Sequence, residues 1–288
     1  MDMIGDTRMR TMFSRQLIEA RHEMLSIYEA LDLSLHDAVR SFVTDDTALA
    51  ERTKREVGRI EARCDNLEVV CYNLISMQGP MASDFRTLQT INFVNYNLQR
   101  ISDKVFRIAR AARKKVKADI ELPAELIELI EREATFVYRV LGLSVSALVS
   151  NDMTLAGDLL DQDGPVHEIY EEFFRTYNRM NTGEMADEDS LDDLRRVIMV
   201  ARYLDRIASI SIDAASRIIF MLTGRRLSLA DAADADEGEL EDMRIPSGEG
   251  VILNPEADVR YVSRLPLDEV SEDLAKLIKR VKDGEIEE

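Results

Sequence analysis

Five basic residues recur at spacings of three or four near the middle of the chain: Lys104, Arg107, Arg110, Lys114 and Lys117. On an α-helix this spacing places side chains along one face. Such a positive stripe could bind an acidic surface of a partner protein. Alternatively, it is a solvated face whose cations stabilise the negative end of the helix dipole. The sequence supports both interpretations.

Residues that could do catalytic chemistry are sparse. The three histidines, His22, His36 and His167, lie far apart and form no His-x-x-x-His pair. One Glu-x-x-His spacing joins Glu19 to His22, whereas a di-iron helical bundle needs two such pairs. We find neither a glycine-rich phosphate loop nor a Gly-x-Ser-x-Gly nucleophile motif. The sequence therefore offers no catalytic constellation, and we expect no enzyme.

Cysteine usage and hydropathy indicate the compartment. Cys64 and Cys71 are seven residues apart, which is about 10 Å along a helix and too far for a disulfide. Residues 1–21 lack a signal-peptide apolar core. The most apolar stretch, 137–149, is interrupted by Arg139 and is too short to span a membrane. We expect a cytoplasmic protein with reduced, buried cysteines and no direct membrane insertion.

Acidic charge is concentrated at the C-terminal end. The chain of 288 residues has 37 Lys plus Arg and 55 Asp plus Glu, a net charge of −18. Residues 227–288 hold 18 acidic and 7 basic residues, which leaves only −7 for the rest. This balance argues against binding to nucleic acid, which needs a basic footprint. It also separates a nearly neutral body from an acidic extension.

Apolar residues recur with helical periodicity through most of the body. The composition suits helices, because 13 Met and many Leu, Ala, Glu and Arg accompany only 6 Pro and 12 Gly. We predict six helical segments: 7–43, 48–77, 83–116, 124–150, 154–180 and 190–222. Gly164-Pro165 should break or kink the fifth of these segments. Their short connections favour antiparallel neighbours, so we expect an all-α fold.

The third segment repeats in the sixth. A shift of 106 positions places six apolar residues on apolar residues and aligns Leu98-Gln-Arg-Ile101 with Leu204-Asp-Arg-Ile207. This register indicates an internal duplication into two tandem three-helix bundles of long helices. The predicted boundaries are 1–118 and 119–226 for the repeats, 227–250 for an acidic linker, and 251–288 for an arm. The arm should contain a short amphipathic helix over 268–282.

Four short strings identify a family. They are Pro80-Met-Ala-Ser-Asp-Phe-Arg86 with Leu98-Gln-Arg-Ile-Ser-Asp103, and Ala201-Arg-Tyr-Leu-Asp-Arg-Ile207 with Ile218-Ile-Phe-Met-Leu-Thr-Gly224. Together they resemble the PhoU family of phosphate-uptake regulators, over about residues 8–226. We assign four charged residues of these strings to the family motif and expect them to have a structural role: Asp84, Arg86, Arg100 and Arg206.

The resemblance implies a fold of two packed three-helix bundles and a non-enzymatic role. Family members restrain a phosphate ABC transporter and silence a sensor histidine kinase when phosphate is plentiful. The expected partners are therefore the transporter ATPase and the kinase, which the protein would join as an adaptor. We also expect a homodimer, because long amphipathic bundles often dimerise.

The resemblance also implies possible iron, zinc or other divalent ions, held by a Glu/Asp-x-x-x-Asp motif on the third helix of each repeat. Residues four apart share a helix face, so two carboxylates can bind one cation. Here each copy keeps one acid: Gln99 precedes Asp103, and Ser209 follows Asp205. The alternative is a simple salt bridge of each Asp, with Arg100 or Arg206 as partners.

Three functions therefore compete. An adaptor that negatively regulates phosphate uptake leads. A carboxylate metal-binding bundle is the alternative, although the damaged acidic pairs weaken it. A DNA-binding regulator is the third, but no recognition helix is evident and the acidic extension would repel DNA.

Overall fold

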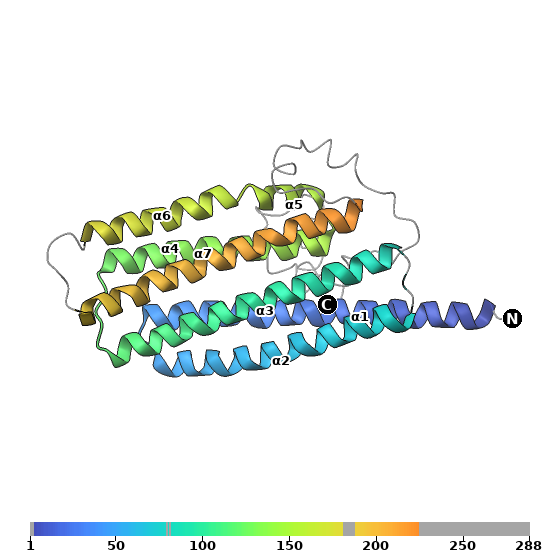
Figure 1. The fold of residues 1–288 in the computed structure, drawn as a ribbon, viewed down its shortest axis with the longest axis horizontal. Helices are drawn as coiled ribbons and strands as arrows, with labels where there is room; N and C mark the ends of the chain where they lie inside the picture. The colour runs from blue at the N-terminus through green and yellow to red at the C-terminus, as the bar shows by residue number, and fades with distance from the viewer. Residues whose placement is uncertain (1–2, 79, 81, 181–187, 225–288) are drawn as a thin grey trace, which may run out of the picture.

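The computed structural model describes residues 3–78, 80, 82–180 and 188–224. Within these residues every regular element is a helix, as predicted. The helices are α1 (Met3–Val43), α2 (Thr47–Gln78), α3 (Ala82–Lys117), α4 (Ala124–Ser150), α5 (Met153–Leu160), α6 (Asp163–Met180) and α7 (Glu188–Thr223). Figure 1 shows an elongated molecule in which α1–α3 form one bundle and α4–α7 lie beside it as the second.

Specific residues cap several helix ends. Asp46 Oδ1 accepts a hydrogen bond from the Leu49 amide at 2.8 Å, which caps α2. The side chain of Asp152 caps α5 through two backbone amides in the same way. At the end of α7, Gly224 has φ 68° and its amide donates to Phe220 O at 2.8 Å. This left-handed cap is the geometry that favours glycine.

The predicted interruption of the fifth segment is confirmed. The chain leaves α5 after Leu160 and re-enters a helix at Asp163, so the break lies just before Gly164-Pro165. Pro165 stands in the first turn of α6, where its missing N–H leaves no hydrogen bond unmade. The second repeat therefore has four helices in place of three.

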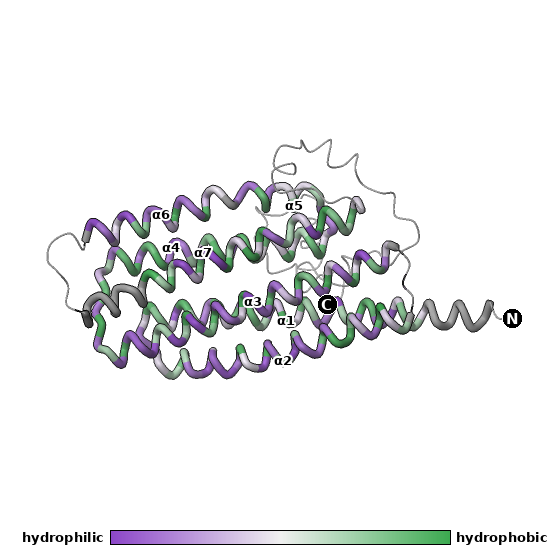
Figure 2. Tube along the Cα trace, viewed as in Figure 1, coloured by the Kyte–Doolittle hydropathy of each residue, from purple (hydrophilic) through white to green (hydrophobic). Residues whose placement is uncertain are grey.

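One hydrophobic core runs through both bundles. The predicted stripes face inward, and Leu31, Leu35, Leu88 and Leu204 have no exposed surface. Figure 2 shows hydrophobic residues alternating with hydrophilic ones along most helices. Cys64 and Cys71 are free and buried, as expected.

The helix α4 is apolar enough, by length and composition, to cross a membrane. However, 72% of its most apolar window is buried inside the fold. Its apolar surface is therefore core surface, in keeping with its position between α1, α6 and α7.

The two repeats are joined mainly by α3 and α7. Asn97, which is buried, donates from Nδ2 to Ile210 O at 3.2 Å. Arg86 Nε donates to Met221 O at 3.3 Å. The Arg217 guanidinium stacks over the Phe93 ring, 4.5 Å from its centroid. These contacts join the N-terminal half of α3 to the C-terminal part of α7, so the two repeats pack directly against each other there.

Candidate functional site

The first copy of the candidate metal motif holds a neutralised carboxylate. Asp103 accepts hydrogen bonds from Lys104 Nζ at 2.7 Å and from Arg107 Nε at 3.0 Å. Partial burial works to raise the pKa of Asp103, but the bonds from Arg107 and Lys104 outweigh it and hold that pKa below its usual value. Two cations already satisfy this carboxylate, so it does not fit a metal ion.

The expected pairing of Asp103 with Arg100 is wrong. Arg100 Nη1 points across the repeat interface and lies 3.7 Å from Asp213 Oδ2 on α7. The reason is competition for partners, because Arg100 also donates to Asn97 Oδ1 on the preceding turn, while Lys104 and Arg107 bind Asp103. Gln99, four residues before Asp103, instead donates from Nε2 to Asp65 Oδ1 on α2 at 3.0 Å. Gln99 therefore links two helices of its bundle.

The second copy has a different environment, because a buried carboxylate from α4 lies near Asp205. Glu133 is 2% exposed. Neither of its carboxylate oxygens has a hydrogen-bond partner in the described part of the chain. Burial, and then the nearby charge of Asp205, raises the pKa of Glu133 to about 9. Ser209 donates its hydroxyl to the Asp205 backbone oxygen at 3.1 Å.

The sequence analysis missed Glu133, although a signal was present. With the shift of 106 positions, Glu133 corresponds to Ile27, which is fully buried in the first repeat. A carboxylate thus replaces an apolar core residue, and such a group is costly to bury unless it is protonated or paired. A comparison of the two repeats at core positions would have found it.

The donor set near Asp205 is small for a metal cluster. Among the described residues, no group of three or more His, Cys, Asp and Glu is positioned to hold a metal ion. Glu133 and Asp205 could supply carboxylate oxygens to one hard cation, which is the chemistry that calcium, magnesium and manganese prefer. The second repeat fits a single ion better than the first does.

The basic stripe is shorter than its sequence suggests. Lys104 and Arg107 are engaged by Asp103. Arg110, Lys114 and Lys117 are exposed, and none of the three forms an ion pair with another described residue. They make up the free part of the stripe, on the last turns of a helix that the core holds in place.

Two neighbouring cations are structural. Arg113 forms an ion pair with Glu51 of α2. Lys115 is 3% exposed and donates to Phe42 O at 3.0 Å, while Asp45 Oδ1 lies 2.9 Å from its Nζ. These contacts fix α3 against the ends of α1 and α2, and they keep both charges from a partner.

The family-motif residues have structural positions. Asp84 is buried in the first turn of α3, where the positive end of the helix dipole stabilises a carboxylate. Arg86 and Arg100 reach α7, as described above. Arg206 is exposed on α7.

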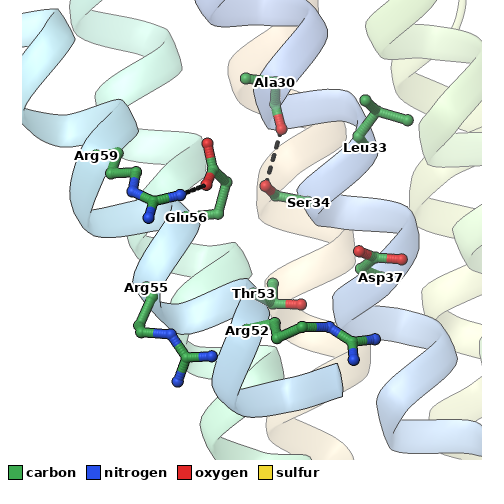
Figure 3. Close-up of a pocket in the computed structure, with 9 residues that line it drawn as sticks. All are labelled: Ala30, Leu33, Ser34, Asp37, Arg52, Thr53, Arg55, Glu56 and Arg59. Carbon is green, nitrogen blue, oxygen red and sulfur yellow. Dashed lines mark hydrogen bonds and ion pairs between the residues drawn. The ribbon is translucent and has the colours of Figure 1, made fainter. Parts of the chain in front are cut away.

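A groove lies between α1 and α2, with a volume of about 470 Å³. Figure 3 shows Arg52, Arg55 and Arg59 along α2 and apolar Ala30 and Leu33 on α1. Its other lining residues are Ser34, Asp37, Thr53 and Glu56. Sequence analysis did not single out this groove, because its two walls come from separate segments.

Comparisons with known proteins agree on one family. The PhoU domain matches residues 24–112 and 130–218, which are offset by the predicted 106 positions. A phosphate-specific transport system accessory protein PhoU homolog 1 of Methanothermobacter thermautotrophicus is 26% identical, over 74% of this chain and 95% of its own. A PhoU homolog of Clostridium acetobutylicum is 23% identical, over 77% of this chain and 99% of its own.

Two crystal structures share the fold. The phosphate transport system regulatory protein PhoU from Streptococcus pneumoniae has a TM-score of 0.66 at 18% identity, covering 75% of this chain and 99% of its own. PhoU from Pseudomonas aeruginosa also has a TM-score of 0.66, at 22% identity, with 74% and 100% covered. The tandem-repeat architecture is therefore confirmed.

Proposed function

Because this chain belongs to the PhoU family, we propose that it is a negative regulator of phosphate uptake and of phosphate-starvation signalling. It would act in the cytoplasm as an adaptor between the ATPase of a phosphate ABC transporter and a sensor histidine kinase. The observation that carries the proposal is the match of both repeats. Relatives named as phosphate-specific transport accessory proteins align over nearly their whole length.

The free cations Arg110, Lys114 and Lys117 support docking to an acidic partner surface. A rigid helix holds them, and they have no intramolecular partner among the described residues. Such charges mainly increase the association rate and the salt dependence of binding. They are also favourable at a helix C-terminus, so a binding measurement must separate the two roles.

The test of the regulatory role combines gene deletion with charge reversal. At high phosphate, deletion should make phosphate uptake constitutive, and unchanged uptake would overturn the proposal. The Arg110→Glu/Lys114→Glu variant should lower the melting temperature by no more than a few degrees but bind the transporter ATPase at least tenfold more weakly at low salt. Arg175→Glu/Arg202→Glu is the matched control on the second repeat, and it should bind normally. Equal binding by both variants would exclude the α3 stripe as the docking surface.

Binding of one divalent cation is a second candidate activity. The unpartnered oxygens of Glu133 beside Asp205 favour it. Manganese or zinc should raise the melting temperature of the wild type and of Asp103→Asn, but not of Glu133→Gln or Asp205→Asn. An equal shift in all four proteins would place the ion elsewhere. No shift in any of them would reject the site.

We also propose a homodimer, because long amphipathic helices of this kind commonly associate. Light scattering coupled to size exclusion should give twice the chain mass of 32.8 kDa. A mass of one chain across micromolar concentrations would contradict it.

A further inference from the structure

Two arginines of the α1–α2 groove lack a structural role. Arg52 and Arg55 are exposed, and neither forms an ion pair with another described residue. Lys114 and Lys117 differ from them, because the last turn of α3 stabilises cations through the helix dipole. Arg52 and Arg55 lie in the N-terminal part of α2, where the dipole gives a cation no such benefit. Their charge is available to an anionic occupant.

The groove also presents apolar surface. Leu33 is 60% exposed and lines it together with Ala30. Glu56 is engaged by Arg59 at 2.7 Å, so it does not neutralise Arg52 or Arg55. Asp37 on α1 is the other carboxylate of the lining (Figure 3). A polypeptide that carries several acids and some apolar side chains suits such a groove better than a compact inorganic anion does.

The chain itself contains such a polypeptide. Residues 231–242 include seven acids and no base, with Leu240 within the run and Met243 just after it. This segment lies outside the described residues. Relatives align over 95% and 99% of their own length but over only 74% and 77% of this chain. About a quarter of the chain therefore has no counterpart in them.

Chain length allows the segment to reach the groove. The helix α7, with 36 residues, is about 54 Å long at ~1.5 Å per residue. About 16 extended residues span the same distance at ~3.4 Å each. The segment starts seven residues after Gly224 and ends eighteen after it. The groove lies toward the far end of the bundle, because Arg113 pairs with Glu51 there whereas Arg86 meets Met221 beside Gly224. The last acids of the segment, Glu239, Glu241 and Asp242, follow Gly224 by 15 to 18 residues and can therefore reach it, whereas Asp231 and Asp234 cannot.

We propose that residues 239–243 of this chain bind in cis to the α1–α2 groove, with Glu239, Glu241 and Asp242 on Arg52 and Arg55. Leu240 and Met243 would cover the apolar surface of Leu33 and Ala30. Tethering gives a short linked segment an effective concentration in the millimolar range, so a weak contact is enough to occupy the groove. The contact would cover part of the first bundle until an acidic partner competes for the same arginines.

The test uses the full chain and a fluorescent peptide of residues 229–244. The tail-neutralised variant carries Glu237→Gln, Glu239→Gln, Glu241→Gln and Asp242→Asn. It should bind the peptide at least tenfold more tightly than the wild type, whose own segment competes. Adding Arg52→Gln/Arg55→Gln to the tail-neutralised variant should abolish its binding of the peptide. Adding Lys114→Gln/Lys117→Gln, which removes the same charge from α3, should leave it intact.

Each other result overturns the proposal. Equal peptide affinity for the wild type and the tail-neutralised variant would show that the groove is not occupied in cis. Loss of binding only with the α3 pair would move the contact to the basic stripe. Loss of peptide binding with each of the two pairs, the groove pair and the α3 pair, would indicate general charge attraction without a specific site. If the wild type binds the peptide more weakly as its own concentration rises, the segment comes from a second copy. Absence of binding throughout would remove the contact altogether.

Discussion

Glu133 is the residue whose chemistry the fold changes most. Burial and the proximity of Asp205 raise its pKa to about 9, compared with 4.5 for an ordinary glutamate. The folded state therefore keeps a proton that the unfolded chain releases at neutral pH. The stability contributed by the protonated Glu133 is fully present below pH 4.5 and is lost as the pH rises to about 9. At neutral pH this group costs stability unless a cation compensates.

Replacing Glu133 with glutamine should therefore stabilise the protein at alkaline pH. Glutamine resembles the protonated acid and needs no proton, so the free energy of unfolding should rise by on the order of 1–3 kcal/mol at pH 8. At pH 5 the variant and the wild type should differ little. Urea unfolding of metal-free protein at both pH values measures the effect. Glu131→Gln, an exposed neighbour on α4, is the control and should change nothing. A pH-independent difference for Glu133→Gln would contradict the raised pKa.

At the scale of elements, the turn between α1 and α2 depends on α3. Lys115 donates to Phe42 O and pairs with Asp45, which has a left-handed φ of 57°. Its Nζ also lies 5.2 Å from the centre of the Phe42 ring. A buried cation with two polar partners holds this end of the bundle together.

Lys115→Met should thus lower the free energy of unfolding by about 1–3 kcal/mol, since it leaves Phe42 O without its donor. Lys114→Met, one residue earlier and exposed, should stay within about 0.5 kcal/mol of the wild type. Chemical denaturation of the two variants measures the difference. If both variants match the wild type, Lys115 does not stabilise the turn.

Two glycines, one inside a helix and one just after a helix end, should respond to alanine in opposite directions. A Cβ on Gly58, inside α2, would meet no atom within 4 Å, so Gly58→Ala should add about 0.5–1 kcal/mol of stability. Gly224 has φ 68°, so Gly224→Ala should destabilise the end of α7 by about 1 kcal/mol. Thermal unfolding compares them. Effects of the same sign would contradict the assigned backbone geometry.

At the scale of the whole molecule, the repeats should unfold together. One hydrophobic core includes residues of both, and Asn97 bonds across the interface. Calorimetry should therefore show a single transition for the body of the protein. Asn97→Ala should lower its midpoint by a few degrees, because it removes a buried hydrogen bond between the repeats. Two separate transitions in the wild type would mean that the repeats are independent domains.

Local patterns predicted the helices and the family. Apolar periodicity placed six segments whose ends agree with the described helices to within a few residues, and local caps such as Asp46 and Gly224 lie at these ends. These features depend on interactions within a few residues of each other, so they can be derived from sequence. The predicted repeat boundaries stay predictions, and the predicted linker, arm and 268–282 helix lie outside the described residues.

Side-chain pairing across helices was decided by the tertiary structure. The sequence by itself shows a single acid, Asp103 or Asp205, in each copy of the candidate motif, and a basic stripe after Asp103. Only the packed bundles show that Gln99 reaches Asp65, that Arg100 reaches Asp213, and that Glu133 approaches Asp205. The reason is physical: a helix face is set by spacing along the chain, whereas its partner depends on which helices pack together and in what rotation.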